Sequence, residues 1–195
     1  MKERILERAG ELYFTLGFRS VTMDDIAADL GISKKTIYQH FSDKNELVEA
    51  VSIHFLKRHE NRQTDCCRAG GNPLEEMIAT TRRMRELLTN LNPAIFHDLQ
   101  KYYPKALQHY LNHKEKYKEV LVENITEGIK QGYYRKEIDP LTMARLRAVS
   151  VDMAFDPSVF PTSELPLVEI QLMLIDHFIR GIVTEKGLAA YEEIK

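Results

Sequence analysis

The stretch TMDDIAADLGISKKTIYQHF, residues 22–41, decides how the start of this 195-residue chain folds. Thr22 can cap a helix, and Asp25, three residues later, can return the hydrogen bond to the backbone of Thr22, which is the pattern of a capping box. Gly31 permits the positive φ that a tight turn between two helices commonly needs. The apolar Ile37 faces inward from the second helix, so the stretch predicts a helix-turn-helix.

The outer face of this second helix suits the major groove of DNA, because it carries donors and cations and no acidic side chain. Lys contacts guanine or phosphate, Gln pairs with adenine, Thr reaches bases or phosphate, and Tyr and His donate to phosphate. A solvated helix with scattered lysines is the alternative interpretation. We predict contacts near the bases from Lys34, Lys35, Thr36 and Gln39, contacts near the phosphates from Tyr38, His40 and Lys44, and further contacts from Thr22 and Ser33.

Helical periodicity extends from this stretch in both directions, whereas the alternation typical of strands is almost absent. Upstream, apolar residues from Ile5 to Leu16 share one face of a helix that ends at Gly17. Downstream, we expect the hydroxyl of Ser42 to cap a fourth helix that runs to about residue 62. The chain is therefore predicted to be all-α.

The clearest break in the chain is the loop expected at residues 64–73, TDCCRAGGNP, where small and helix-breaking residues collect. We expect a three-helix helix-turn-helix head at residues 1–45, joined to a larger helical-bundle body at residues 46–195. The remaining helices are predicted at about 23–30, 34–40, 74–91, 94–101, 105–131, 140–155 and 164–185, with Gly187 marking a further break.

The last of these predicted helices is apolar over much more than one face, which indicates burial on two sides. A single helix-turn-helix reads only half a site, whereas two heads related by a dyad read a palindrome with half-sites about 34 Å apart. We therefore expect a homodimer with its interface on this helix and on residues 140–155. The expected interface residues are Leu172, Ile175 and Ile179.

The composition excludes several other classes of protein. Lys and Arg number 27 against 29 Asp and Glu, so no chain-wide basic excess coats nucleic acid or anionic lipid unselectively. No apolar run approaches the roughly 18 residues of a membrane span, and the charged start MKERILER is not a secretory signal. The adjacent Cys66 and Cys67 cannot form a disulfide framework. We expect a cytoplasmic protein without membrane contact.

Six short motifs stand in order along the first third of the chain: Leu16-Gly17-Phe18, Val21-Thr22, Ile26-Ala27, Gly31-Ile32-Ser33, Lys35-Thr36-Ile37-Tyr38-Gln39-His40-Phe41 and Lys44-Asn45-Glu46-Leu47. With them, residues 1–62 resemble the DNA-binding head of the tetracycline-repressor (TetR) family of bacterial regulators. The phrase GYYRKEIDP, residues 132–140, resembles the turn after that family's long middle helix. The resemblance implies a body that binds a small-molecule effector and forms a dimer, so we expect a homodimeric regulator, most simply a repressor.

Adaptable Met and amphipathic aromatic side chains gather in the middle helices of the predicted body, and they could line a pocket for a mostly apolar effector. Ordinary core packing explains each of them as well. The expected pocket residues are Met84, Phe96, Tyr110, Tyr117 and Met143.

Other functions fit the sequence less well. His109 and His113 have a spacing that can grip one metal ion, with Glu115 or Asp98 as a third ligand, but no HExxH or Glu-x-x-His motif occurs. We expect no metal and no cofactor. A nucleophile elbow and a phosphate-cradling glycine loop are both missing, so the chain is not expected to be an enzyme. The main alternative is a DNA-binding architectural protein, or a regulator without a small-molecule ligand.

Overall fold

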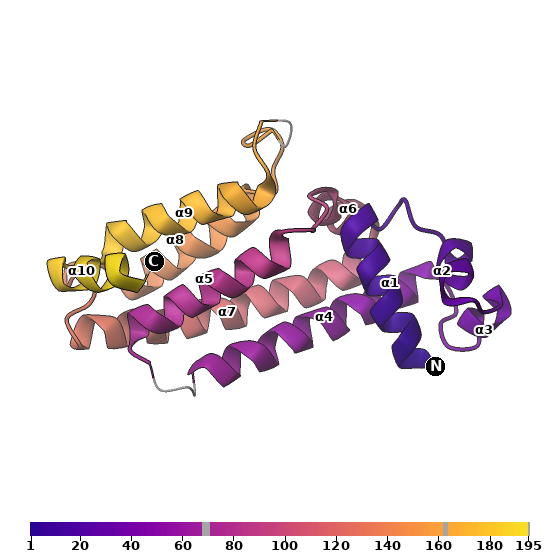
Figure 1. Ribbon diagram of the computed structural model, residues 1–195, viewed down its shortest axis with the longest axis horizontal. Helices are drawn as coiled ribbons and strands as arrows, with labels where there is room; N and C mark the ends of the chain where they lie inside the picture. The colour runs from indigo at the N-terminus through magenta and orange to yellow at the C-terminus, as the bar shows by residue number, and fades with distance from the viewer. Residues whose placement is uncertain (68–70, 162–163, 195) are drawn as a thin grey trace. The chain divides into compact units, whose positions relative to one another are not determined.

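The computed structural model describes residues 1–67, 71–161 and 164–194, and the side chains of all of these except residues 59 and 61–67 (Figure 1). Throughout this part the secondary structure is helical, apart from one antiparallel bridge between Tyr134 and Val183. The predicted all-α class is confirmed. The helices are α1 Lys2–Leu16, α2 Met23–Leu30, α3 Lys34–Tyr38, α4 Lys44–Cys67, α5 Pro73–Leu88, α6 Ala94–Tyr102, α7 Pro104–Lys130, α8 Pro140–Met153, α9 Leu167–Ile182 and α10 Glu185–Ile194.

The chain divides into two compact units. The head unit comprises residues 1–60 and 90–113, and the body unit comprises residues 61–89 and 114–195. The long helix α7 contributes its first ten residues to the head unit and the rest to the body unit. These packing units differ from the functional division expected at residues 45 and 46, which stays a prediction.

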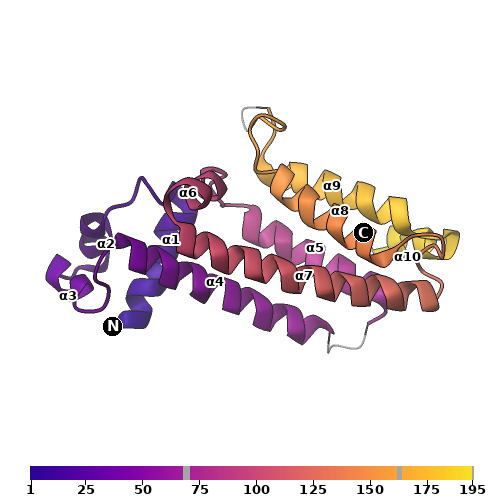
Figure 2. The same ribbon diagram turned by 180° about the vertical axis from the view of Figure 1, so that it is seen from behind.

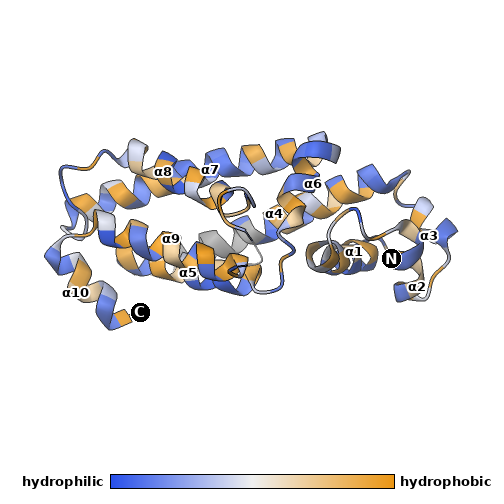
Figure 3. Cartoon of the chain, turned by 90° about the horizontal axis from the view of Figure 1, so that it is seen from above, coloured by the Kyte–Doolittle hydropathy of each residue, from blue (hydrophilic) through white to orange (hydrophobic). Residues whose placement is uncertain are grey.

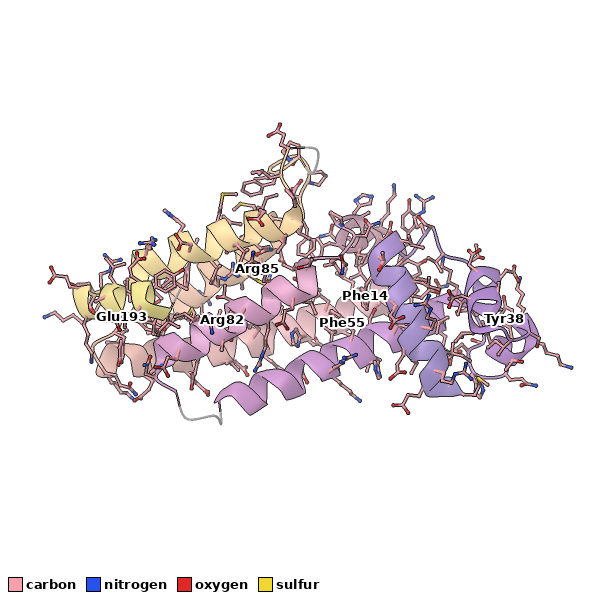
Figure 4. The ribbon with its side chains drawn as sticks, viewed as in Figure 1. Phe14, Tyr38, Phe55, Arg82, Arg85 and Glu193 are labelled. Atoms are coloured by element: carbon pink, nitrogen blue, oxygen red, sulfur yellow. The ribbon has the colours of Figure 1, made fainter. Side chains whose placement is uncertain are left out.

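The head unit packs the helix-turn-helix into a larger core that includes α1, α4 and α6. Its core residues include Ile5, Tyr13, Phe18, Ile26, Ile37, Phe41, Leu47, Ile95 and Leu99. Phe14 of α1 and Phe55 of α4 contact each other with ring centroids 4.2 Å apart (Figure 4), and Phe18 lies 5.5 Å from Tyr103 at the end of α6. The helix-turn-helix is therefore held in place by packing against other helices as well as by its own short turn.

The body unit is a bundle of α5, α8, α9, α10 and the second part of α7. Helices α8 and α9 run side by side in two opposite views (Figure 1, Figure 2), and α5 packs against α9 and α10. The core includes Leu74, Leu121, Ile125, Ile175 and Ile179. At the end of the chain, the Arg82 guanidinium of α5 donates a 2.7 Å hydrogen bond to the carbonyl oxygen of Ile194, beside Glu193 in Figure 4.

Two breaks expected from the sequence lie elsewhere in the structure. Helix α4 continues to Cys67, so residues 64–67 are helical rather than loop, while residues 68–70 lie outside the described residues. Gly187, expected to mark a break, lies inside α10. A Cβ at this position would lie 2.2 Å from the carbonyl oxygen of Tyr133. The glycine therefore allows close packing on the 132–140 turn instead of ending a helix.

The fourth helix is capped differently from the prediction. The backbone N–H of Glu46 donates to Oδ1 of Asp43 at 2.8 Å, so Asp43 caps α4. Ser42 instead donates from its backbone and its hydroxyl to the Glu46 carboxylate, at 2.6 and 2.7 Å. These hydrogen bonds lower the pKa of Glu46. The cap falls one residue later than expected because the helix begins at Lys44.

Candidate nucleic-acid interface and candidate ligand cavity

The helix-turn-helix has the local geometry that its sequence predicts. Thr22 Oγ1 accepts from the backbone N–H of Asp25 at 3.2 Å, and the backbone N–H of Thr22 donates to the Asp25 carboxylate at 2.8 Å, which completes the capping box. Gly31 ends α2 with φ +64°, in the left-handed region that favours glycine. Arg8 of α1 donates to Asp29 of α2 at 2.8 Å and so fixes α2 against α1.

Helix α3 presents a free outer face. Ile37 is fully buried, whereas the neighbouring Tyr38 is 44% exposed and lies on α3 in Figure 4. Within the residues that the structure describes, no hydrogen bond or ion pair occupies the side chains of Lys35, Tyr38 and Gln39. Because donors without an internal partner can bind an external acceptor, these three side chains are the ones best placed to contact DNA.

The predicted reading helix is two residues shorter than expected. It ends at Tyr38, and Gln39 and His40 lie in the following turn, where the backbone N–H of His40 donates to the carbonyl of Ile37 at 2.9 Å. Gln39 is exposed and His40 half-buried. Both side chains therefore extend from the turn that follows α3 rather than from the helix itself.

Three of the predicted contact residues use their hydroxyls within the helix-turn-helix, and two of them, Thr22 and Ser33, cap helices. The Thr22 hydroxyl is occupied by Asp25, with its own hydrogen bond of 2.7 Å to the carboxylate. Ser33 caps α3 by accepting from the backbone N–H of Thr36 at 3.1 Å, and the two hydroxyls lie 2.9 Å apart. Their direct role is thus to shape the turn, while their exposure leaves them open to a second partner.

Two lysines of the expected interface have internal partners. Lys34 forms a 2.6 Å ion pair with Asp24 of α2, which raises the pKa of Lys34. Both partners are well exposed, so the pair is worth little in water and is open to competition by phosphate. Lys44 is half-buried beside the Tyr13 ring and donates to the carbonyl of Arg19 at 3.4 Å. Burial lowers the pKa of Lys44.

The structure adds one cation that the sequence pattern did not single out. The ammonium of Lys2 lies 5.3 Å from the centroid of the Phe41 ring, directly after α3. Helical periodicity places Lys2 on the outside of α1, but it gives no information about which other helix lies nearby. Lys2 is therefore a cation that only tertiary packing places near the end of the helix-turn-helix.

The body unit contains a small cavity of about 40 Å³. This volume holds a few water molecules at most, far below the roughly 300–1,000 Å³ of a typical ligand pocket. The lining comes from α5, α7, α8 and α9: Glu76, Met77, Thr80, Thr81, Met84, Tyr117, Val120, Leu121, Asn124, Arg147 and Ile175.

The five residues expected to line one effector pocket are divided between the two units. Met84 and Tyr117 line the body cavity. Met143 packs against the body core but is absent from the cavity lining. Phe96 and Tyr110 belong to the head unit, where their ring centroids lie 5.4 Å apart. Two charged residues, Glu76 and Arg147, also line the cavity, and the sequence pattern predicted neither of them there because a cavity lined by four helices depends on tertiary packing.

The residues expected to form the dimer interface are mostly internal. Ile175 and Ile179 lie in the core of their own body unit, with Ile179 only 1% exposed, while Leu172 is half-buried. They therefore have little surface to offer to a second copy, which differs from the expectation. Helices α8 and α9, which both carry hydrophobic positions in Figure 3, do expose other apolar side chains. These are Leu146, Val149 and Met173.

The histidine pair of α7 faces carboxylates of α4 within the head unit. His109 Nε2 lies 3.1 Å from Glu49 Oε1, and His113 Nδ1 lies 3.2 Å from Glu60 Oε1. Among the described residues, no three His, Cys, Asp or Glu side chains gather as a metal site. The side chains of Cys66 and Cys67 lie outside the described residues. In the same part of the chain, no helix is long and apolar enough to cross a membrane.

Comparison with known proteins places this geometry in a family. The family model described as "Bacterial regulatory proteins, tetR family" matches residues 5–51. The uncharacterized HTH-type transcriptional regulator YvaF of Bacillus subtilis is 28% identical over 95% of this chain and 97% of its own length. The HTH-type transcriptional repressor KstR2 of Mycobacterium tuberculosis is 27% identical over 69% of this chain and 70% of its own length.

Solved structures share the fold. A TetR-family regulator from Agrobacterium tumefaciens aligns with a TM-score of 0.79 over 94% of this chain and 97% of its own, at 16% identity. FadR of Bacillus subtilis, solved with stearoyl-CoA, aligns with a TM-score of 0.71 over 93% and 100% at 18% identity. A regulator from Saccharomonospora viridis, solved with choline, aligns with a TM-score of 0.76 over 94% and 98% at 22% identity.

The fold and the helix-turn-helix thus define a DNA-binding transcriptional regulator rather than an enzyme. The match over residues 5–51 makes the head that of a TetR-family regulator, and the relative that is 28% identical extends the likeness to an HTH-type regulator along nearly the whole chain.

Proposed function

We propose that this regulator is a homodimeric repressor that binds a palindromic operator and is released by a small molecule held in the body unit. The observation that carries the proposal is the outer face of α3 and of the turn after it, where the side chains of Lys35, Tyr38 and Gln39 have no partner in the described part of the chain. The relative named as a repressor, at 27% identity, supports the direction of regulation. Such a protein acts where the chromosome is, in the cytoplasm.

The DNA-binding step can be tested with the purified full chain. Fragments selected from a random DNA pool should contain an inverted repeat, and binding should have a dissociation constant of about 10⁻⁸ to 10⁻¹¹ M that weakens steeply with added salt. The same assay with unrelated duplex as competitor measures specificity. Weak binding that is blind to sequence would contradict the proposal.

The dimer is proposed to form through the outward faces of α8 and α9. Leu146, Val149 and Met173 are exposed in the single chain, and a dimer would cover them. Apolar surface removed from water stabilises association by about 25 cal/mol per Å² before the costs of ordering. This face replaces Ile175 and Ile179 as the proposed contact, because those two residues already pack inside one chain.

The body cavity is the proposed effector site. Met77, Met84, Tyr117 and Leu121 give it an apolar lining, and methionine adapts readily to new shapes. Because its present volume is about 40 Å³, an effector must push these side chains apart to enter. Helix α7 lines the cavity and also contributes residues 104–113 to the head unit, so it is the proposed carrier of the change.

Linkage gives the test of this coupling. An effector that weakens operator binding by some factor must itself be weakened by operator by the same factor, about 5 to 150 for typical couplings. The architectural alternative predicts no compound with this reciprocal effect. Measurement of effector affinity with and without a saturating operator duplex separates the two.

A further inference from the structure

Arg147 is the most deeply buried charged residue of the cavity wall. Its side chain is only 1% exposed, and it reaches the cavity from α8. One terminal nitrogen, Nη1, donates to the hydroxyl of Ser150 at 3.0 Å, and the other, Nη2, contacts the sulfur of Met84 at 3.4 Å. Nε is buried, and no described residue forms a hydrogen bond with it.

This arrangement leaves a positive charge without a counter-charge. A guanidinium does not lose its proton in a protein, and it has five N–H donors to satisfy. In the part of the chain that the structure describes, no ion pair joins Arg147 to a carboxylate. A thioether is only a weak acceptor. Because burial of an unpaired charge is strongly unfavourable, the site is incomplete as it stands.

The incomplete edge of the guanidinium has a definite shape. Nε and Nη2 point the same way, and together they form the edge that carboxylates bind with two parallel hydrogen bonds. Among the described residues, that edge has one sulfur contact, at Nη2, and no acceptor for Nε. A carboxylate that displaced the Met84 sulfur would satisfy both donors and neutralise the charge.

Four of the other polar side chains in the lining are already engaged: Glu76, Thr80, Thr81 and Asn124. The Thr80 and Thr81 hydroxyls donate to carbonyl oxygens of their own helix at 3.0 and 2.9 Å. The Glu76 carboxylate accepts from Asn124 at 2.9 Å. Glu76 precedes Met84 by eight residues on α5, which is about 12 Å along the helix axis, so its negative charge is well removed from Arg147.

From this distribution we infer that the effector is an amphipathic carboxylate, whose acid group pairs with Arg147 and whose apolar chain or ring lies along Met77, Tyr117 and Leu121. The inference rests on the proposed function, because it assumes that the body cavity is the effector site. It replaces the mostly apolar effector expected from the sequence with one that carries a single negative charge.

Three probes with unbranched alkyl chains of seven or eight carbons and different head groups test the inference on the full-length protein: octanoate, octan-1-ol and octyltrimethylammonium. Charge-assisted hydrogen bonds contribute about 1.5–3 kcal/mol, which corresponds to roughly a 10- to 150-fold difference in affinity. Calorimetric titration should therefore show octanoate binding at least tenfold tighter than octan-1-ol, and the cationic probe binding more weakly than either. Equal affinities for the acid and the alcohol would overturn the assignment of a carboxylate.

Variants identify the residue responsible. Arg147→Met keeps most of the side-chain volume without the charge, and it should reduce the preference for octanoate over octan-1-ol to about one. Arg147→Lys keeps the charge without the two-donor edge, and it should retain part of the preference. Arg145→Gln, at an exposed position two residues earlier on α8, is the matched control and should keep the full preference. An undiminished preference in Arg147→Met would overturn the role of Arg147.

The thermal unfolding temperature of Arg147→Met without ligand distinguishes a binding group from a structural one. Replacement of an uncompensated buried charge by an apolar side chain is often neutral or stabilising, so the variant should unfold at the wild-type temperature or above it. A large fall would indicate that Arg147 holds the fold together. Release of the operator separates the two proposals. If octan-1-ol releases the operator as effectively as octanoate, the body cavity remains the effector site but the pairing of a carboxylate with Arg147 is overturned. If none of the three probes binds, both proposals are overturned.

Discussion

The head and the body build their candidate sites in opposite ways. The DNA-facing groups of the head come from one continuous stretch, residues 22–44, and they lie on the surface, where their charges are paired loosely or not at all. The cavity of the body takes its lining from four helices far apart in the chain, and its cation is buried. A site made for a large polyanion can form locally on a surface, whereas a site that encloses a small molecule needs walls from several helices.

The same contrast appears in how each region handles charge. Asp24 and Lys34 neutralise each other in water, where an exchange of partners costs little. Arg147 has no such freedom, because water does not reach it. A lysine of the head can therefore exchange its carboxylate partner for a phosphate at small cost. The body cavity, as the proposed effector site, would instead favour a ligand whose negative charge pairs with Arg147.

The strongest test of the contrast introduces a charge into the apolar face proposed for the dimer. Val149 is 58% exposed in the single chain, so Val149→Glu should leave the fold intact and yet prevent association, because an unpaired charge would be buried in the interface. Sedimentation should show monomers, with operator affinity lost. Gln100→Glu, at an exposed position on α6, should leave the dimer unchanged; a dimeric Val149→Glu protein would place the interface elsewhere.

The second test compares a buried and an exposed aromatic residue at the end of the helix-turn-helix. Phe41 is buried after α3, so Phe41→Ala should lower the free energy of unfolding by about 3–5 kcal/mol, as large-to-small changes of aromatic core residues do. Tyr38→Ala removes an exposed side chain and should change it by no more than about 0.5 kcal/mol while weakening operator binding. Urea unfolding and mobility-shift titration measure the two quantities. Similar losses of stability in both variants would show that Tyr38 is structural.

The third test separates base contacts from phosphate contacts within the head. Gln39→Ala should cost about 1–3 kcal/mol of binding free energy and relax preference at one operator position. Lys44→Gln should weaken binding to all sequences and reduce the salt slope by about one unit. The measurements are affinities for operator variants at several salt concentrations. The division would be contradicted if both variants had the same effect on preference and slope.

A fourth test concerns the exposed ion pair on the head. Asp24→Asn removes an acidic group beside Lys34 and frees its ammonium, so operator affinity should rise by an amount that corresponds to about 0.2–1 kcal/mol, the range of exposed pairs. Glu123→Gln on α7 in the body unit makes the same change of net charge and should have no effect. An equal gain in both variants would mean that only net charge matters.

The smallest expected effect is on the acid stability of the head. Hydrogen bonds from Arg8 lower the pKa of Asp29, so this carboxylate stabilises the folded head above its unfolded pKa of about 3.9 and loses that contribution as the pH falls through its folded pKa. Asp29→Asn should therefore be less stable than wild type at pH 6, and the difference should shrink as the solution is acidified below pH 4. A difference that is independent of pH would assign the effect to packing.

Sequence reasoning succeeds where the determinants are local. The capping box of Thr22 and Asp25 and the left-handed Gly31 depend on residues within one turn, and the structure has both. It fails at Gly187, because a glycine that ends a helix and one that lets a carbonyl approach look the same in a sequence. The apolar stripe of α9 that contains Ile175 and Ile179 likewise indicates that this face is buried. It does not show whether the same chain or a second copy covers the face.

The cavity shows the same limit more strongly. Methionine and tyrosine are conspicuous in a sequence, and two of the five expected residues do line it. Arg147, however, occupies a helix that also carries Arg145, and nothing in the local pattern tells the buried arginine from the exposed one. Only the packing of α8 against α5 and α9 makes that distinction.

As the proposed effector site, the cavity would also limit, through its small volume, how fast the regulator responds. Binding that requires a conformational change has a lower association rate than entry into an open pocket, and the apparent affinity is reduced by the fraction of molecules that are open at any moment. With about 40 Å³ available, entry of an effector into the proposed site would require lining side chains such as Met84 and Tyr117 to move apart. A cell that uses this protein would therefore show a delay between the arrival of the effector and transcription, set by an opening rate that substitutions at these two positions can tune.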